Sequence, residues 1–87
     1  MNNLVKLLLV INMDEDIFKI IGDNIKKYRI KKGYNIEDLA LMTELDKEYL
    51  TKIEKEGVDG SITFNNLSKI ATCLDINIIN LFKKKEE

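Results

Sequence analysis

Apolar residues recur at helical spacing through most of the chain, beginning just after a cluster of acidic residues. Asp14, Glu15 and Asp16 place negative charge where the exposed amides and the dipole of a helix start favour it. The apolar positions that follow are three or four residues apart: Ile17, Ile21, Ile25 and Tyr28. Gly33 is a suitable C-cap residue, so the pattern predicts a first helix that ends there.

A second, shorter amphipathic segment follows directly. Asn35 and Asp38 resemble the capping pair of a helix over residues 36–43. The inner face of this helix is expected to carry Leu39 and Met42.

A third helix is expected to begin after Asp46, which is a suitable N-cap residue. Leu50 and Ile53 would face inward from it. Ala40 is small where the second and third helices must cross closely, and Leu45 fills the turn between them. This is the spacing of a helix-turn-helix motif.

The remainder of the chain predicts a loop and two further helices. The segment KEGVDGSI contains two glycines and an aspartate and is expected to be a loop. Thr63 then caps a fourth helix, and Asn77 caps a fifth. The inner faces of these helices are expected to carry Phe64, Leu67, Ile70, Ala71, Leu74, Ile78, Leu81 and Phe82. The pattern predicts an all-α fold of five short helices over residues 14–83, with a charged tail at 84–87.

The composition agrees with one small helical domain and removes most catalytic chemistry. The 87-residue chain is 45% hydrophobic and 33% charged, with no proline and four glycines. It contains no histidine and a single cysteine, Cys73, so neither a zinc site nor a histidine-dependent catalytic centre can be assembled. We expect no enzyme activity, no metal, no cofactor and no small-molecule ligand. A lone thiol fits the reducing cytoplasm, and the place of Cys73 on an apolar face predicts its burial.

The apolar run LVKLLLVI near the N-terminus has two interpretations. It is far shorter than the roughly 20 residues that cross a membrane, and it lacks the features of a secretory signal, so we expect no membrane partner. Residues 1–13 are an N-terminal extension that is either disordered or a strand that pairs with the same segment of a second subunit. Alternatively, translation starts at Met13, because the segment MDEDIFKIIG that begins there resembles the N-terminus of a protein.

In their order and spacing, these segments resemble the lambda-repressor-like, or XRE-type, helix-turn-helix family. IGDNIKKYRIKKGYNIEDLA looks like the first two helices of that family, LDKEYLTKIE like its recognition helix, and ITFNNLSKIATCLDINIINLF like its last two. The resemblance covers about residues 17–83 and implies a five-helix DNA-binding domain. The recognition helix of such a domain enters the major groove by its N-terminal part.

The resemblance also implies roles for individual residues. Four side chains of helix 46–55 are expected to contact bases: Lys47, Glu48, Thr51 and Lys52. Lysine can donate to guanine, threonine can hydrogen-bond or contact a methyl group, and glutamate can accept from cytosine. The expected phosphate contacts are Lys26, Lys27, Lys31, Lys32 and Asn35. Arg29 and Glu54 match a pair that ties the recognition helix to its scaffold, so a structural ion pair is expected between them.

Charge and two unusual positions leave a second function open. Residues 17–83 contain eleven Lys and Arg and ten Asp and Glu, a net charge of +1, so attraction to DNA would rest on the local lysine cluster. The family usually has glutamine in place of Ile36 and glycine in place of Glu44, where a left-handed turn costs glutamate about 1 kcal/mol.

We expect a cytoplasmic, homodimeric regulator that binds near-palindromic double-stranded DNA. The alternative is a protein–protein interaction module on the same fold, acting as a partner subunit or as an antagonist of another regulator.

Overall fold

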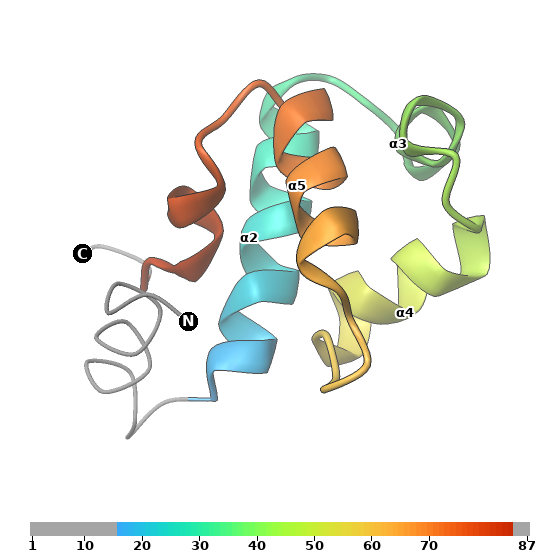
Figure 1. Ribbon diagram of the computed structural model, residues 1–87. Coiled ribbons are helices and arrows are strands. Elements are labelled where there is room, and N and C mark those ends of the chain that lie inside the picture. The colour runs from blue at the N-terminus through green and yellow to red at the C-terminus, as the bar shows by residue number, and fades with distance from the viewer. Residues whose placement is uncertain (1–15, 85–87) are drawn as a thin grey trace.

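The computed structural model describes residues 16–84, which form four α-helices and one 3-10 helix. In chain order these are α2 (Ile17–Lys31), α3 (Ile36–Thr43), α4 (Lys47–Glu56), α5 (Phe64–Cys73) and the 3-10 helix η1 (Ile78–Phe82). In Figure 1, α3 and α4 lie on one side of the upright α2, and η1 lies on the other. The all-α prediction is confirmed. The interpretations of residues 1–13 and of nearly all of the charged tail fall outside the described residues.

Both ends of α2 follow from local sequence chemistry. The Asp16 side chain accepts hydrogen bonds from the backbone N–H groups of Phe18 and Lys19, at 3.1 and 3.3 Å. After the C-cap residue Lys32, Gly33 adopts φ +78°, a conformation that costs glycine little. Within residues 16–84, neither α2 nor any other helix combines the length and the apolar character needed to cross a bilayer.

The predicted capping pair holds α3, but the inner face of this helix differs from the prediction. The Asn35 side chain accepts from the N–H of Asp38 at 2.7 Å, and the Asp38 carboxylate accepts from the N–H of Asn35 at 2.9 Å. Leu39 is fully buried as expected, whereas Met42 is exposed and Thr43 is buried instead. The buried stripe follows the spacing i, i+3, i+4, i+7 from the first helical residue, and Met42 lies outside it.

Two details of α4 and α5 also correct the sequence-based predictions. Asp46 occupies the N-cap position of α4, but its side chain makes no capping hydrogen bond. Phe64, expected on the inner face of α5, is 70% exposed. It is the first residue of α5 and stands one turn before Leu67, where the buried face of that helix begins. Thr63 caps α5 as predicted and accepts from the N–H of Asn66 at 3.0 Å.

The last predicted helix is a 3-10 helix that a buried asparagine ties to α2. The Asn77 side chain caps η1 by accepting from the N–H of Ile79 at 3.0 Å. Asn24 of α2 is only 5% exposed, and its amide donates to the carbonyl oxygens of Leu81 and Lys83, at 2.9 and 2.8 Å. Carbonyls at a helix end have no partner within the helix, so Asn24 satisfies groups that burial would otherwise leave unpaired.

Each element contributes a fully buried aliphatic residue to a single core. The largest such residues are Ile25, Leu39, Leu50, Ile70, Leu74 and Leu81. Burying one aliphatic side chain of this size stabilises the fold by about 1.5–3 kcal/mol. A domain this small therefore depends on all of its helices, including the short α3 and η1, to hold α4 in place.

Candidate nucleic-acid interface

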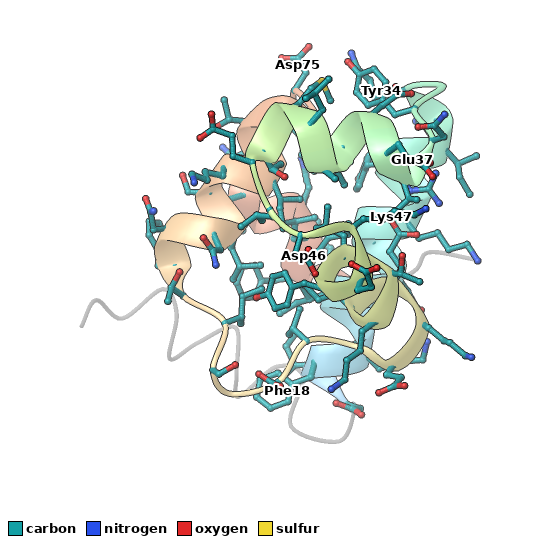
Figure 2. The ribbon with its side chains drawn as sticks, turned by 90° about the vertical axis from the view of Figure 1, so that its right-hand side faces the viewer. Phe18, Tyr34, Glu37, Asp46, Lys47 and Asp75 are labelled. Carbon is teal, nitrogen blue, oxygen red and sulfur yellow. The ribbon has the colours of Figure 1, made fainter. Side chains whose placement is uncertain are left out.

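Helix α4 has one buried face and one exposed face. Leu50 and Ile53 pack into the core as predicted. The exposed side carries all four residues predicted to contact bases: Lys47, Glu48, Thr51 and Lys52. Successive positions in this set are one or three residues apart, so they share one side of the helix. Figure 2 turns the part of the molecule that carries α3 and α4 toward the viewer.

The turn into α4 is built around a left-handed residue and a buried hydroxyl. Glu44 has φ 61° and ψ 27°, the conformation expected of a glycine at this place. The Thr43 hydroxyl donates to the carbonyl of Leu39 at 2.7 Å and accepts from the N–H of Leu45 at 3.2 Å. Thr43 thus satisfies backbone groups on both sides of Glu44, which fixes the direction in which the chain enters α4.

Arg29 and Glu54 form the expected ion pair with both oxygens of the carboxylate engaged. Two guanidinium nitrogens of Arg29 donate to Glu54 at 2.7 and 2.9 Å, and the third donates to the carbonyl of Tyr34 at 2.7 Å. The two side chains are only 13% and 8% exposed. The hydrogen bond to Glu54 raises the pKa of Arg29. One arginine of α2 therefore fixes both α4 and the turn before α3.

Lys47 is also paired, but on the surface. Its Nζ donates to Oε2 of Glu37 at 2.7 Å, and the two side chains are 52% and 60% exposed. Figure 2 shows the pair at the border between α3 and α4. This hydrogen bond lowers the pKa of the Glu37 carboxyl and raises the pKa of the Lys47 ammonium. Both groups are therefore charged near neutral pH.

Of the four lysines in the predicted phosphate cluster, Lys26 lies beside the exposed face of α4. It lines a shallow groove of about 320 Å³ together with Ile36 and Thr51. Ile36, at the position where the family usually has glutamine, is half-buried and packs against the core. Asn35 is exposed at the start of α3, with its side-chain oxygen engaged in the capping bond.

The other three lysines of the cluster lie along different borders of α2. The Lys27 ammonium stands 4.8 Å from the centre of the Tyr28 ring. Lys31 and Lys32 line a hollow beside the loop that follows α5, where Lys32 Nζ is 3.9 Å from the Asp75 carboxylate. The four lysines therefore do not form one compact patch, because Lys26 borders α4 whereas Lys31 and Lys32 share a hollow beside the loop that follows α5.

Gly22, to which the sequence pattern gives no role, sets the distance between α2 and α4. A Cβ at Gly22 would stand 2.2 Å from the carbonyl oxygen of Ile53 and 2.9 Å from Cα of Gly57. Gly57 has φ +95°, and a Cβ there would stand 2.9 Å from Cα of Lys19. The available signal in the sequence is an isolated glycine inside a helical pattern, which often marks close packing.

Cys73 is half-buried rather than buried, and its Sγ lies 3.5 Å from the carbonyl oxygen of Met42. Among residues 16–84, His, Cys, Asp and Glu side chains do not gather in groups of three that could hold a metal ion. The groups that this surface can offer to a ligand are therefore hydrogen-bond donors and charged side chains.

Comparison with known proteins places this geometry in a family. The helix-turn-helix family matches residues 25–80, a range that contains α3, the turn at Glu44, α4 and α5. The chain belongs to the lambda-repressor-like helix-turn-helix family. In this family the exposed helix after the turn is the recognition helix, which here is α4.

The relatives include transcriptional regulators from Bacillus. The HTH-type transcriptional regulator SinR of Bacillus subtilis is 38% identical over 69 residues, which cover 78% of this chain and 60% of SinR. The chain therefore spans less than two thirds of the length of this relative. A crystal structure of SinR in complex with DNA has a TM-score of 0.66 at 33% identity, covering 72% of this chain and 98% of that one. A SinR–SinI complex has a TM-score of 0.67 at 33% identity, covering 76% of this chain and 63% of that one.

Proposed function

We propose that this chain is a sequence-specific double-stranded DNA-binding transcriptional regulator whose helix α4 enters the major groove. The observation that carries the proposal is the row of exposed polar side chains on α4, in a fold whose relative SinR has been solved in complex with DNA. The row consists of Lys47, Glu48, Thr51 and Lys52, and each of these residue types can hydrogen-bond to base edges. The bidentate tie between Arg29 and Glu54 supports a rigid presentation of this row.

We propose Lys26 and Asn35 as the phosphate contacts closest to the recognition helix. Lys26 shares its groove with Thr51, so a phosphate bound there would fix the register of α4 on the duplex. Lys27, Lys31 and Lys32 would then add attraction to more distant phosphates.

We further propose that the protein acts in the cytoplasm and binds its operator as a homodimer. One recognition helix reads only a few base pairs, and helix-turn-helix dimers bind two half-sites about 34–36 Å apart. The selected DNA should therefore be a near-palindrome.

Selection from a pool of randomised duplexes tests the proposal. We expect an inverted repeat to be enriched, and its affinity to fall with salt with a slope of about −0.9 per neutralised phosphate. Thr51→Ala or Lys47→Ala should relax the preference at individual base pairs by roughly 5- to 150-fold. Lys26→Ala should instead weaken the binding of all sequences alike.

Lys69→Ala is the matched control, because Lys69 is an exposed lysine of α5 outside the proposed contact surface. It should leave both affinity and preference unchanged. If folded protein retains no duplex even at low salt, the DNA-binding proposal is wrong.

A second candidate function is protein binding on the same fold. It is favoured by the relative whose structure is a SinR–SinI complex, and by Leu41 and Met42 of α3, which are 81% and 39% exposed. This candidate would replace the first if no duplex is retained while a protein partner is bound by the wild type and lost in a Leu41→Ser, Met42→Ser double variant.

A further inference from the structure

The salt bridge between Glu37 and Lys47 lies on the surface proposed to contact DNA, and the stability of the fold does not account for it. Its two side chains are more than half exposed, and ion pairs as exposed as this add little to folding free energy. Lys47 is also the first residue of α4, where the positive end of the helix dipole disfavours a cation. The pair therefore requires a different explanation.

Glu37 and Lys47 both belong to helices whose positions are fixed by other contacts. Glu37 belongs to the first turn of α3, where the dipole favours a carboxylate and the Asn35–Asp38 capping box fixes the helix start. Lys47 belongs to α4, which the pair between Arg29 and Glu54 holds in position. The Glu37 carboxylate thus stays within reach of Lys47 in the DNA-free protein.

We propose that Glu37 is a specificity-determining residue. Its carboxylate compensates the positive charge of Lys47 by pairing with it, until a base acceptor competes for the Lys47 ammonium group. The inference rests on the proposed DNA-binding function. On a sequence without a suitable acceptor, Lys47 remains paired with Glu37 and adds no net charge to the attraction for phosphates. Opposite guanine, the ammonium donates to N7 or O6, which only the matching sequence provides. Glu37 therefore weakens non-specific binding more than specific binding.

The same arrangement gives a reason for an acidic residue on a DNA-facing surface. Glu48 lies next to Lys47 in sequence and contributes to the local field, but the direct hydrogen bond comes from Glu37. The effect of Glu37 on DNA binding should consequently act through Lys47 and disappear without it.

The test compares Glu37→Gln with the wild-type full chain on the selected duplex and on a scrambled duplex of the same length, by fluorescence anisotropy over a range of salt concentrations. Freeing Lys47 for one extra phosphate should raise affinity for the scrambled duplex roughly eightfold at 0.1 M salt and steepen its salt slope by about 0.9. The selected duplex should gain less, so the ratio of specific to non-specific affinity should fall. The matched control, Glu56→Gln, removes the same charge roughly 13 Å along α4 from Lys47 and should leave this ratio unchanged.

A Lys47→Gln background provides the decisive comparison. There, Glu37→Gln should leave affinity for the scrambled duplex unaltered. An equal gain for both duplexes, or the same gain without Lys47, would show that Glu37 simply repels phosphates and would overturn the inference. If the wild type binds a selected sequence and Glu37→Gln leaves the ratio unchanged, the inference alone fails. If the wild type binds no duplex, the proposed function fails and this inference fails with it.

Discussion

Glu44 shows how packing on either side of a residue can outweigh an unfavourable local conformation. Its φ of 61° costs a residue with a Cβ about 1–2 kcal/mol relative to its preferred regions. Leu39 before the turn and Leu50 after it are both fully buried, and each contributes about 1.5–3 kcal/mol. The turn therefore forms without glycine, and the strain remains as a local cost that a substitution can remove.

Glu44→Gly should stabilise the protein by about 1 kcal/mol, because glycine adopts the left-handed conformation without steric cost. For a domain of this size, that corresponds to a rise in Tm of about 5 °C, measurable by circular dichroism. Glu44→Ala is the control, since it removes the carboxylate but keeps the Cβ and its strain. A similar Tm gain in both variants would attribute the effect to charge, and an unchanged Tm in the glycine variant would show that the turn is unstrained.

Which residue contacts could be predicted depended on how far apart their partners lie in the sequence. The capping bonds of Asn35 and Thr63 join residues three apart, so composition and order were sufficient to identify them. The Asn24 amide bonds a carbonyl 57 residues away, and Glu37 meets Lys47 across two helices. Such contacts depend on tertiary packing that no local pattern contains. The Arg29–Glu54 pair was expected only because the family resemblance supplied it.

At the scale of elements, two glycines set how closely α2 and the end of α4 approach each other. Gly22 and Gly57 bring backbone atoms of the two segments close enough that a methyl group does not fit at either position. The N–H of Val58, just after Gly57, donates to the carbonyl of Phe18 at 3.1 Å. Helical periodicity predicted both helices correctly but carries no information about how closely they approach, so the role of Gly22 was not predicted.

Gly22→Ala should destabilise the fold by about 3 kcal/mol or more, although alanine favours helix formation. The new Cβ would lie 2.2 Å from a backbone oxygen of α4, and backbone cannot move aside as a flexible side chain can. Urea unfolding followed by circular dichroism measures the change. Gly60→Ala is the matched control, because a Cβ there meets nothing within 4 Å. Equal unfolding midpoints for the two variants would contradict the proposed close crossing.

At the scale of the whole molecule, the structure separates the residues that hold the fold from those proposed to contact DNA, although both occur on α4. Leu50, Ile53 and Glu54 face the interior, while the proposed base contacts are exposed. The charge of the whole chain also differs from the local charge beside α4. The chain has a formal net charge of −1, whereas individual lysines border the recognition helix. DNA binding should therefore depend on local contacts and be lost readily in salt.

Arg29→Ala and Lys52→Ala should separate these two groups of residues in one pair of measurements. The Glu54 side chain is only 8% exposed in the intact pair, so removing its partner Arg29 should cost about 3 kcal/mol and lower Tm by roughly 15 °C. Lys52 is exposed, so its removal should change stability by no more than about 0.5 kcal/mol while still weakening DNA binding. Thermal melts followed by circular dichroism give the change in stability, and anisotropy titrations at a temperature where both variants are folded give the change in DNA affinity.

Equal, small shifts in Tm would show that the Arg29–Glu54 pair does not hold α4 in place. A large Tm loss in Lys52→Ala would show that this side chain supports the fold instead of reading DNA.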